Sequence, residues 1–307
     1  MKVTVAIPTY NNLKDLKRAL DSVFMQDYDD YEIVITDDSK NNETEEYING
    51  LNHPKIRYFH NIPSLGPSAN WNSMIEKSKG EYVKILFDDD WFITKDALRK
   101  MVEMMDKHPE ADFGYCRQIG FKRGTNKVVH RRAQKYVKRL PKDPMELFLA
   151  NRISAPSVAI IRKSLPVRFD EQIIWANDTD YYMSALLYNN KIVFINKEFI
   201  ALGCPETQLT QTYEKNTPKI LRDSFHTFNK FEPYVEKSKF KDKIHKKYIG
   251  TLKHRNIDTI ESLKEILQEI PVPDFVVEYY TAPPKVKKTL ADKIRSWFDF
   301  LTGGHSK

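Results

Sequence analysis

Two kinds of hydrophobic spacing alternate along the first hundred residues. Short runs of β-branched and aromatic residues, which predict strands, occupy residues 2–7, 31–36, 56–60 and 81–87. Apolar residues spaced as on one face of a helix predict helices over 13–24, 43–50 and 68–79. We expect Asn11 or Asn12 to cap the first of these helices and Gly50 to close the second. The alternation predicts a mostly parallel sheet with helices on both faces.

The rest of the pattern divides the chain into four parts. Further helices are predicted over 95–107, 144–151 and 178–188, and further strands over 112–118, 157–162 and 192–195. From about residue 218 the chain becomes lysine-rich with helical apolar spacing, and prolines cluster after residue 270. We therefore expect an α/β domain over 1–217, a helical extension over 218–270, a proline-containing linker over 271–284 and a basic amphipathic helix over 285–307.

The predicted C-terminal helix carries one continuous apolar stripe. It consists of Val286, Leu290, Ile294, Trp297, Phe298 and Leu301. Basic residues flank the stripe, and a helix of this kind can lie in a lipid interface. Packing against the body of the protein or a second subunit would explain the stripe equally well. We therefore expect residues 285–301 to meet either a membrane surface or a protein surface, including that of an oligomer.

The composition excludes several classes of protein. The chain has 307 residues, of which 41% are hydrophobic, so it can bury a core and is not disordered. Its two cysteines, Cys116 and Cys204, form no disulfide framework and agree with a reducing compartment. We find no run of ~18 apolar residues and no signal-peptide pattern. We expect a cytoplasmic protein that is at most peripheral on the inner face of the cell membrane.

The net charge of +7 is unevenly spread. Residues 113–142 contain ten lysines and arginines and no acidic residue. A surface of this kind attracts polyanions, and a solvated basic loop is the simpler alternative. One alternative function is therefore a non-catalytic module that binds nucleic acid through residues 117–142. No RNA-binding or helix-turn-helix signature accompanies this stretch, so we do not expect a nucleic-acid partner.

Acidic residues follow two of the predicted strands. Asp37 and Asp38 follow the second strand, and Asp88, Asp89 and Asp90 follow the fourth. Ligands of parallel α/β sheets bind beyond the carboxyl ends of the strands. Three adjacent carboxylates suit Mg²⁺ or Mn²⁺, although a solvated turn or a helix cap would also explain them. No glycine-rich dinucleotide fingerprint and no Walker loop occurs, so a metal ion would have to hold the diphosphate of a bound nucleotide.

Five motifs in order give the chain a family resemblance. They are IPTYNN (7–12), VITDDS (34–39), LGPSANWN (65–72), GEYVKILFDDDW (80–91) and WANDTDYYMSALLY (175–188). Over roughly residues 1–210 the chain resembles family 2 glycosyltransferases with the GT-A fold. The resemblance implies a GT-A-type (Rossmann-like) mixed sheet flanked by helices, with a C-terminal helical appendage. It also implies an inverting, metal-dependent transfer from a nucleotide-diphosphate sugar, and we expect this donor to be a UDP-sugar.

The resemblance assigns roles to residues within these motifs. The nucleotide-sugar is expected to contact Pro8, Thr9, Tyr10, Asp38, Asn72 and Asp88. Asp89 and Asp90 are expected to hold Mn²⁺ or Mg²⁺. Asp178 is the expected base, with Asp180 as the runner-up, and Trp175 and Asn177 are expected near the acceptor. In such a transfer a carboxylate takes the proton of the acceptor hydroxyl while a cation neutralises the leaving diphosphate.

The sequence departs from the family pattern at several positions. Phe87 stands where the family often has Asp, Trp71 where many members have Arg, and Asn177 where a Glu precedes the catalytic Asp. Residues 203–211 lack the histidine that many members place there. The acceptor implied by the family is a glycan or a lipid-linked glycan in cell-surface polysaccharide synthesis. A nucleotidyltransferase on a related sheet is a further alternative, although residues 11–14 make a poor glycine- and basic-rich loop.

Overall fold

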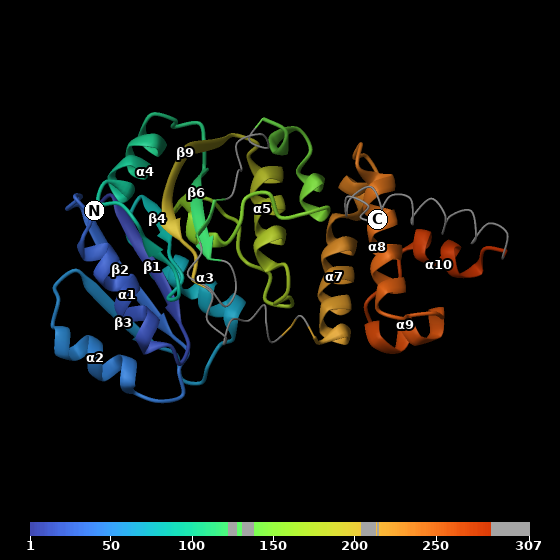
Figure 1. The fold of residues 1–307 in the computed structure, drawn as a ribbon, viewed down its shortest axis with the longest axis horizontal. Helices are drawn as coiled ribbons and strands as arrows, with labels where there is room; N and C mark the ends of the chain where they lie inside the picture. Colours follow the sequence, from blue (N-terminus) through green and yellow to red (C-terminus); the bar gives the residue numbers. More distant parts are fainter. Residues whose placement is uncertain (122–127, 131–137, 204–212, 214, 284–307) are drawn as a thin grey trace. The chain divides into compact units, whose positions relative to one another are not determined.

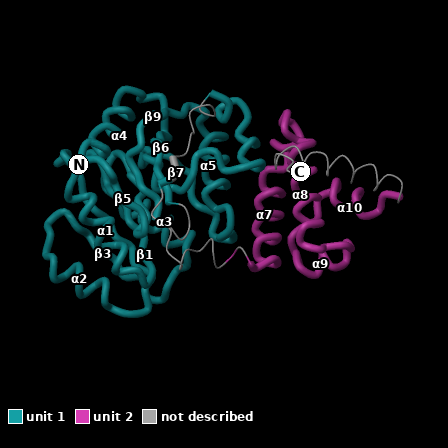
Figure 2. Tube along the Cα trace, viewed as in Figure 1, with its two compact units in different colours: residues 1–211 teal, residues 212–307 magenta. Residues whose placement is uncertain are grey.

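The computed structural model describes residues 1–121, 128–130, 138–203, 213 and 215–283 (Figure 1). The chain divides into two compact units, Met1–Gln211 and Thr212–Lys307 (Figure 2). The sequence pattern places this boundary slightly later, after residue 217. The predicted basic helix over 285–307 lies outside the described residues.

The described part of the first unit is built on a nine-stranded mixed sheet. The strands are β1 (Val3–Thr9), β2 (Tyr31–Asp37), β3 (Ile56–His60), β4 (Tyr82–Ile85), β5 (Trp91–Phe92), β6 (Phe113–Phe121), β7 (Val128–His130), β8 (Ala159–Arg162) and β9 (Ile192–Ala201). Their order is β3-β2-β1-β4-β8-β6-β9-β5, with β7 paired to β6. The neighbouring strands β3, β2, β1 and β4 are parallel to one another, whereas β8 runs antiparallel to both β4 and β6. The predicted mixed sheet is confirmed.

Helices cover this sheet. They are α1 (Leu13–Phe24), α2 (Glu43–Leu51), α3 (Pro67–Lys77), α4 (Ala97–Asp106) and α5 (Asn177–Tyr188), with the 3₁₀ turns η2 (Leu140–Lys142), η3 (Pro144–Phe148) and η4 (Pro156–Val158). Helix α3 packs on β1 and β2, α4 on β6 and β9, and α5 on η3. Residues 144–151, predicted as a helix, form only the short turn η3 before Leu149.

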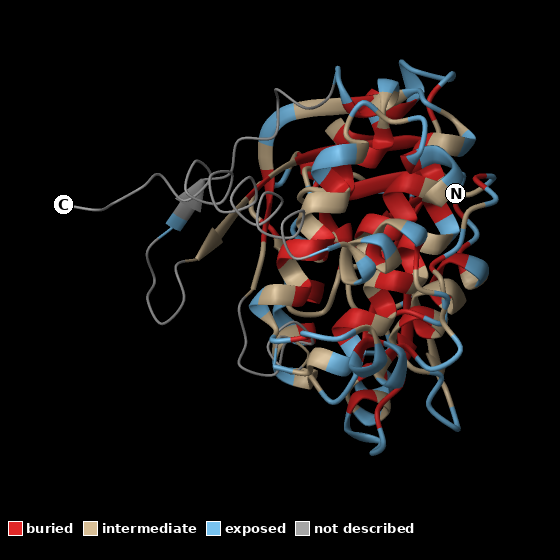
Figure 3. Cartoon of the chain, turned by 90° about the vertical axis from the view of Figure 1, so that its right-hand side faces the viewer, coloured by how far each residue is buried: buried red, intermediate tan, exposed pale blue. Residues whose placement is uncertain are grey.

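Burial explains why the central strands form where they do. Every residue of β1 and β2 is buried, as is typical of parallel strands covered on both faces (Figure 3). In the parallel register Thr9 lies opposite Asp37, and Ala6 lies opposite Ile85. The chain therefore leaves β1, β2 and β4 at the same edge of the sheet. The residues that follow these strands are brought together there, as the sequence predicts.

Two helix ends differ from the sequence prediction. Helix α2 continues past Gly50 and ends at Asn52, which adopts a left-handed conformation with φ of 43°. Asn12 precedes α1, but its side chain makes no capping hydrogen bond. It is instead bonded to the Asp88 carboxylate. Asp88, Asp89 and Asp90 form the acidic turn after β4, so a residue predicted to cap a helix holds this turn instead.

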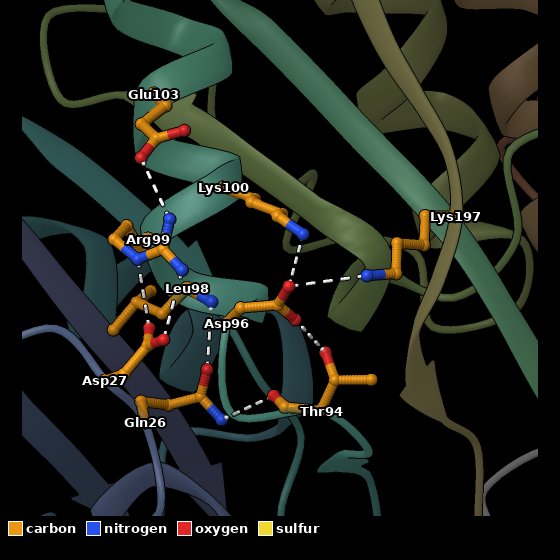
Figure 4. A network of polar contacts seen from close by, with 9 residues as sticks. All are labelled: Gln26, Asp27, Thr94, Asp96, Leu98, Arg99, Lys100, Glu103 and Lys197. Atoms are coloured by element: carbon orange, nitrogen blue, oxygen red, sulfur yellow. Dashed lines mark hydrogen bonds and ion pairs between the residues drawn. The ribbon is translucent and has the colours of Figure 1, made fainter.

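A polar network fastens the start of α4 (Figure 4). The Gln26 amide donates to Thr94 O and accepts from Leu98 N, at 3.0 and 2.9 Å. Asp96 accepts from Thr94 Oγ1 at 2.7 Å and pairs with Lys100 and Lys197. These bonds fix the segment that runs from the acidic turn into α4.

The second unit is helical where it is described. Its helices are α7 (Thr217–Val235), α8 (Lys241–His254), α9 (Ile260–Leu267) and α10 (Asp274–Thr281). Phe228, Tyr248 and Phe275 pack ring against ring in its core, and Phe275 stacks on His245 with centroids 3.9 Å apart. Helix α10 lies inside the stretch 271–284 that its prolines mark as a linker. That prediction is wrong for Asp274–Thr281, because Pro273 sits just before the helix and starts it rather than breaking it.

Candidate active site

The edge where β1 and β4 end brings Thr9, Tyr10 and Asp88 together. Thr9 is buried and donates its hydroxyl to Asp88 Oδ2 at 2.7 Å. Tyr10 is 52% exposed and donates its backbone N–H to the same carboxylate. Pro8 is buried within β1. Of the three motif residues 8–10, Tyr10 is therefore the one with an exposed side chain.

Burial and a neighbouring charge act on Asp88 in the same direction. Loss of hydration and the charge of Asp89 raise the pKa of the Asp88 carboxyl to about 7, against the hydrogen bonds from Thr9 and Asn12. Asp88 is thus held by β1 and by the start of α1. It lies at the edge of the sheet where a nucleotide-sugar is expected.

Asp90 turns inward and is 3% exposed. Its Oδ1 accepts from Gly203 N at 2.9 Å, and Ser157 bonds to the same carboxylate. Beneath it lies Lys84, which is fully buried in β4 and donates its ammonium to Ser157 O and Ile85 O. Burial and the charge of Asp89 raise the pKa of the Asp90 carboxyl well above its usual range, against the bonds from Ser157 and Gly203 and the charge of Lys84. Burial lowers the pKa of Lys84 to about 8. Asp90 is therefore a buried carboxyl group held by Ser157 and Gly203, and its expected role as a metal ligand stays a prediction.

Gly203 is pressed against the backbone of the acidic turn. A Cβ at this position would lie 2.1 Å from Asp89 O, so only glycine allows the approach. Through this contact and its bond to Asp90, the end of β9 is locked onto the turn.

Asp89, like Asp88, stays partly exposed beside the buried Asp90. Its carbonyl accepts from Arg18 at 3.0 Å, and the Arg18 guanidinium stacks on Trp91, 3.8 Å from the ring centroid. In the described part of the chain, no group of three or more His, Cys, Asp or Glu side chains is arranged to hold a metal ion. Mg²⁺-type sites on phosphate substrates commonly use one or two carboxylates, with phosphate and water completing the shell. Asp89 fits such a site.

Asp37 and Asp38 hold the backbone of the site. Asp37 accepts from Tyr58 OH and Ser39 N, both at 2.7 Å. Asp38 is 3% exposed and accepts from Asn61 Nδ2, Leu65 N and Gly66 N at 2.8, 3.2 and 2.8 Å. All three donors come from the loop before α3, so Asp38 holds the shape of that loop. Its expected contact with the nucleotide stays a prediction.

Two asparagines expected to touch substrate are engaged in structural bonds. Asn72 donates to Phe169 O and Glu171 Oε1, both at 2.9 Å, and accepts from Phe169 N at 2.8 Å. Asn177 is 2% exposed and donates to Ser68 Oγ. These side chains tie α3 to the segment before α5 and to α5 itself. Their expected contacts with donor and acceptor stay predictions.

Asp178 stands in the first turn of α5, after Ala176 in a left-handed conformation with φ of 61°. It is partly exposed, and its Oδ2 accepts from Asn151 Nδ2 at 2.6 Å. Its Oδ1 accepts from Thr179 N at 2.7 Å. Loss of hydration raises the pKa of the Asp178 carboxyl to about 6, despite these donors. A carboxyl group with such a pKa is a stronger base than an ordinary aspartate and is ionised at neutral pH.

Asp180, the runner-up base, is fully buried. A carboxylate closed off from solvent cannot reach an acceptor hydroxyl, so the structure favours Asp178. Trp175 is partly exposed, which agrees with a place near an acceptor and does not test it.

Two connections join the acidic turn to the start of α5. The first is the segment 151–157, in which Asn151 bonds to Asp178 and Ser157 Oγ accepts from Phe87 N at 2.9 Å. The second is a chain of rings, in which Trp71 contacts Phe87 at 4.7 Å and Phe169 at 5.1 Å between centroids. Phe169 in turn stacks on Tyr181 of α5 at 4.3 Å. Trp71 and Phe87, two of the departures from the family pattern, thus pack on each other.

The predicted basic surface is only partly described. Arg117 pairs with Glu198 at 2.7 Å, and Arg139 pairs with the buried Glu146. Residues 122–127 and 131–137 of this stretch, and residues 204–212 after Gly203, lie outside the described residues. The described arginines are therefore partners of carboxylates.

Sequence reasoning missed four residues of the site: Asn151, Ser157, Lys84 and Gly203. Lys84 has a readable signal, because a lysine in the middle of the apolar run YVKILF must find a buried partner. Asn151 and Ser157 have no such signal, since their partners lie far away in sequence.

The sheet order, the helices on both faces and the aspartates at the strand ends define a GT-A-type fold. The model of the family "Glycosyl transferase family 2" matches residues 4–166, and the chain belongs to this family.

Curated relatives carry related names. The chain is 28% identical over 203 residues to GalNAc(5)-diNAcBac-PP-undecaprenol beta-1,3-glucosyltransferase of Campylobacter jejuni, covering 64% of this chain and 63% of that protein. It is 32% identical over 114 residues to poly(ribitol-phosphate) beta-N-acetylglucosaminyltransferase TarS of Staphylococcus aureus, covering 35% and 19%. The matched region thus spans less than two thirds of either relative.

Solved structures share the fold at low identity. TarS 1-349 of S. aureus, in complex with UDP-GlcNAc, superposes with a TM-score of 0.65 and 19% identity, covering 88% of this chain and 82% of that chain. Mannosyltransferase PcManGT of Pyrobaculum calidifontis, in complex with GDP-Man and Mn²⁺, gives 0.59 and 16%, covering 96% and 82%. Among the described residues, no helix is long and apolar enough to cross a membrane.

Proposed function

We propose that this protein is an inverting glycosyltransferase that moves a hexosyl or N-acetylhexosaminyl group from a UDP-sugar to a glycan or lipid-linked glycan. One observation carries the proposal. In a family 2 fold, a partly exposed aspartate pair, Asp88 and Asp89, and a separate partly exposed carboxylate, Asp178, are joined by the segment 151–157. One group faces the donor, and the other faces the acceptor.

On the donor side, Tyr10 stacks on the base, and the Thr9–Asp88 pair meets the ribose. Asp89 holds the Mg²⁺ or Mn²⁺ ion that accompanies the diphosphate, and Asp90 stays buried beneath it. When bound, such an ion neutralises charge on the leaving nucleoside diphosphate. The complexes of TarS with UDP-GlcNAc and of PcManGT with GDP-Man and Mn²⁺ support a nucleotide-sugar donor for this protein, which shares their fold.

On the acceptor side, Asp178 takes the proton of the attacking hydroxyl. The acceptor oxygen forms a bond to the anomeric carbon as the bond from that carbon to the diphosphate oxygen breaks. Attack opposite the leaving group inverts the anomeric centre. A pKa near 6 suits this step, because the carboxylate is ionised at neutral pH yet basic enough to share the proton.

The names of two relatives support the proposed class of acceptor. The C. jejuni protein is named for a polyprenyl-diphosphate-linked glycan and TarS for a poly(ribitol-phosphate) polymer. We propose an acceptor of this kind, reached from the cytoplasmic face of the membrane. We also propose that residues 285–301 provide contact with that membrane. Flotation with anionic liposomes, comparing the full chain with one that ends at Pro284, tests this contact.

A thermal-shift screen tests the donor assignment. The full chain is heated with UDP, UDP-GlcNAc, GDP, GDP-mannose or CMP, each with and without Mn²⁺. A ligand at a hundredfold excess over its Kd stabilises the native state by about 2.7 kcal/mol. We expect the largest shift with UDP or UDP-GlcNAc plus Mn²⁺, and loss of its Mn²⁺-dependent part in Asp89→Asn but not in Asp29→Asn. If no nucleotide shifts the transition, the proposal is wrong.

A further inference from the structure

The segment between η3 and η4 contains a strained residue. Ser154 has φ of 105°, a conformation that residues with side chains rarely adopt. Three contacts hold it there. Gln118 Nε2 donates to its Oγ at 2.7 Å, Tyr182 OH donates to its carbonyl at 3.0 Å, and Asn151 Nδ2 donates to the same carbonyl at 3.1 Å. Backbone strain persists where the surroundings enforce it, and such places cluster at functional sites.

The strained turn fixes the amide of Asn151. Its Oδ1 accepts from Ile153 N at 3.0 Å and Ser154 N at 2.8 Å. Its Nδ2 donates to Ser154 O and to Asp178 Oδ2. An amide side chain has two donors and two acceptor sites, so every one of them is used. A flipped amide would turn its oxygen toward the carboxylate and lose all four bonds. The network therefore permits one orientation only.

This arrangement limits which oxygen of Asp178 can act. Oδ1 already accepts from Thr179 N at 2.7 Å and from Thr179 Oγ1 at 3.3 Å. Oδ2 accepts the bond from Asn151 Nδ2, and the backbone N–H of Asp178 itself also acts on the carboxylate. A carboxylate oxygen has about two lone-pair sites, so a second site on Oδ2 is left for another donor.

We propose that Asn151 is a positioning residue for Asp178. Its amide, clamped by the strained turn at Ser154, holds the carboxylate so that the open site of Oδ2 meets the acceptor hydroxyl. This inference rests on the proposed function, because it takes Asp178 as the base. Asn151 touches neither donor nor reacting atoms and acts through Asp178.

The charged and titratable groups around Asp178 come from three elements. On α5 they are Tyr182, whose pKa is raised by burial and by the charge of Asp178, and the buried Asp180. On the segment 151–157 the charged residue is Arg152, which lies 4.0 Å from Glu146 of η3. A donor to a carboxylate favours its ionised form, so Asn151 opposes the effect of burial on the pKa of Asp178.

The chain offers a matched control at the other end of α5. Asn189 donates to Glu110 O at 3.0 Å and to Asp112 Oδ2 at 2.8 Å, and accepts from Lys191 N at 3.0 Å. It is a loop asparagine bonded to an aspartate, as Asn151 is, but its partner is not the proposed base. Asn189→Ala thus reproduces the structural cost of Asn151→Ala without disturbing Asp178.

The first measurement needs no substrate. Carboxyl resonances of the full chain labelled with ¹³C-aspartate are followed against pH, and Asp178→Asn identifies the resonance of Asp178. A hydrogen bond to a charged group is worth roughly 1.5–3 kcal/mol, or about 1–2 pH units. We expect Asn151→Ala to raise the Asp178 midpoint by about one unit. Asn151→Asp keeps the acceptor oxygen of the turn and should raise the midpoint further. Asn189→Ala should leave it in place.

An unchanged midpoint in both folded Asn151 variants would overturn the inference. So would an equal shift in Asn189→Ala. Should Asn151→Ala fail to fold, Asn151→Asp, which retains the shape of the turn, decides alone.

The second measurement follows release of UDP from UDP-GlcNAc as a function of pH, with water as the acceptor. We expect the acidic limb of kcat to move upward with Asn151→Ala, kcat on the plateau to fall about tenfold, and KM for the donor to stay constant. A changed KM with an unchanged pH profile would contradict a positioning role. The proposed function fails separately, when Asp178→Asn turns over at the wild-type rate. The NMR titration still reports on Asn151 in that case.

Discussion

The two sides of the candidate site are built in different ways. On the donor side, backbone and buried side chains absorb most of the acidic residues. Asp37 and Asp38 shape a loop, Asp90 is buried and accepts from Gly203 N, and Asp89 is left partly exposed. On the acceptor side, one carboxylate, Asp178, is held by an asparagine from a strained turn. Most of the clustered aspartates therefore hold the backbone here, whereas the separate Asp178 stays partly exposed.

The largest effect is expected where the acceptor side is broken directly. Asp178→Asn should lower turnover by about 10²–10⁴-fold, because the amide cannot take the acceptor proton. UDP-GlcNAc binding, measured by calorimetry, should remain. The exposed neighbour Glu171 provides a control, since Glu171→Gln should leave turnover near that of the wild type.

The same substitution should stabilise the fold. The pKa of the Asp178 carboxyl is about 6 in the native state and near 3.8 in the unfolded chain, so the native state binds this proton more tightly. Its contribution to the free energy of unfolding thus falls as pH rises from about 4 to about 6. At pH 7, Asp178→Asn should gain on the order of 1–3 kcal/mol in urea unfolding, and at pH 3 almost nothing. A loss of stability at pH 7 would contradict the conclusion that loss of hydration disfavours the charged form of Asp178 in the native state.

The donor side should be most sensitive beneath the aspartate turn. Lys84→Met leaves the carbonyls of Ser157 and Ile85 without their buried donor and removes the positive charge that acts on Asp90. We expect a loss of about 1–3 kcal/mol in urea unfolding, and the double variant Lys84→Met/Asp90→Asn should recover the part of it that comes from the charge. Lys55→Met, which removes a surface lysine 3.8 Å from Asp29, should cost under about 1 kcal/mol. Equal losses in the single and double variants would rule out charge pairing as the cause.

Substitution of Asp38 tests whether this residue holds the loop before α3 or contacts the nucleotide. Asp38→Ala removes three hydrogen bonds of the loop before α3, and we expect a loss of about 1–3 kcal/mol in stability. Binding of UDP should weaken only as far as the loop moves. Asp29→Ala, whose side chain is fully exposed, serves as the control. If Asp38→Ala abolished UDP binding without any loss of stability, Asp38 would be a nucleotide contact after all.

The smallest effect is expected far from both sides of the site, at the start of α4. Bonds from Lys100 and Thr94 hold the pKa of Asp96 well below its usual range. Its contribution to stability is therefore present above about pH 4 and is lost as pH falls through the lowered folded-state pKa. Asp96→Asn should cost under about 1 kcal/mol at pH 7 and less at pH 2, measured by thermal unfolding. A larger loss at pH 2 than at pH 7 would contradict the sign.

Much of the fold could be predicted because its central strands are buried on both faces and read as continuous apolar runs. The same pattern placed Asp37, Asp38 and Asp88–Asp90 at one edge of the sheet. It could not predict the task of each aspartate, since Asp38 and Asp89 look alike until their partners are known. The buried state of Asp90 depends on Lys84 and Gly203, and the orientation of Asp178 depends on Asn151. These partners are distant in sequence.

The prolines of the C-terminal region predict a linker where the structure has a helix. Four of them between residues 271 and 284 indicate a linker, yet Pro273 stands just before Asp274, the first residue of α10, where a missing N–H and a fixed φ favour a helix start. Gly50 predicts the end of α2, but it lies inside the helix, and Asn52 supplies the left-handed residue that ends it. Position relative to the helix, rather than residue type alone, decides both cases.

The contact between Trp71 and Phe87 has a consequence for the conditions the protein tolerates. An ion pair joining α3 to the end of β4 would weaken as dissolved electrolyte rises, because mobile counter-ions shield exposed charges beyond about 10 Å at 0.1 M. Two packed rings have no net charge to shield, and salts that strengthen apolar association reinforce their contact. The contact between Trp71 and Phe87 should therefore persist at high salt concentration as well as in dilute buffer.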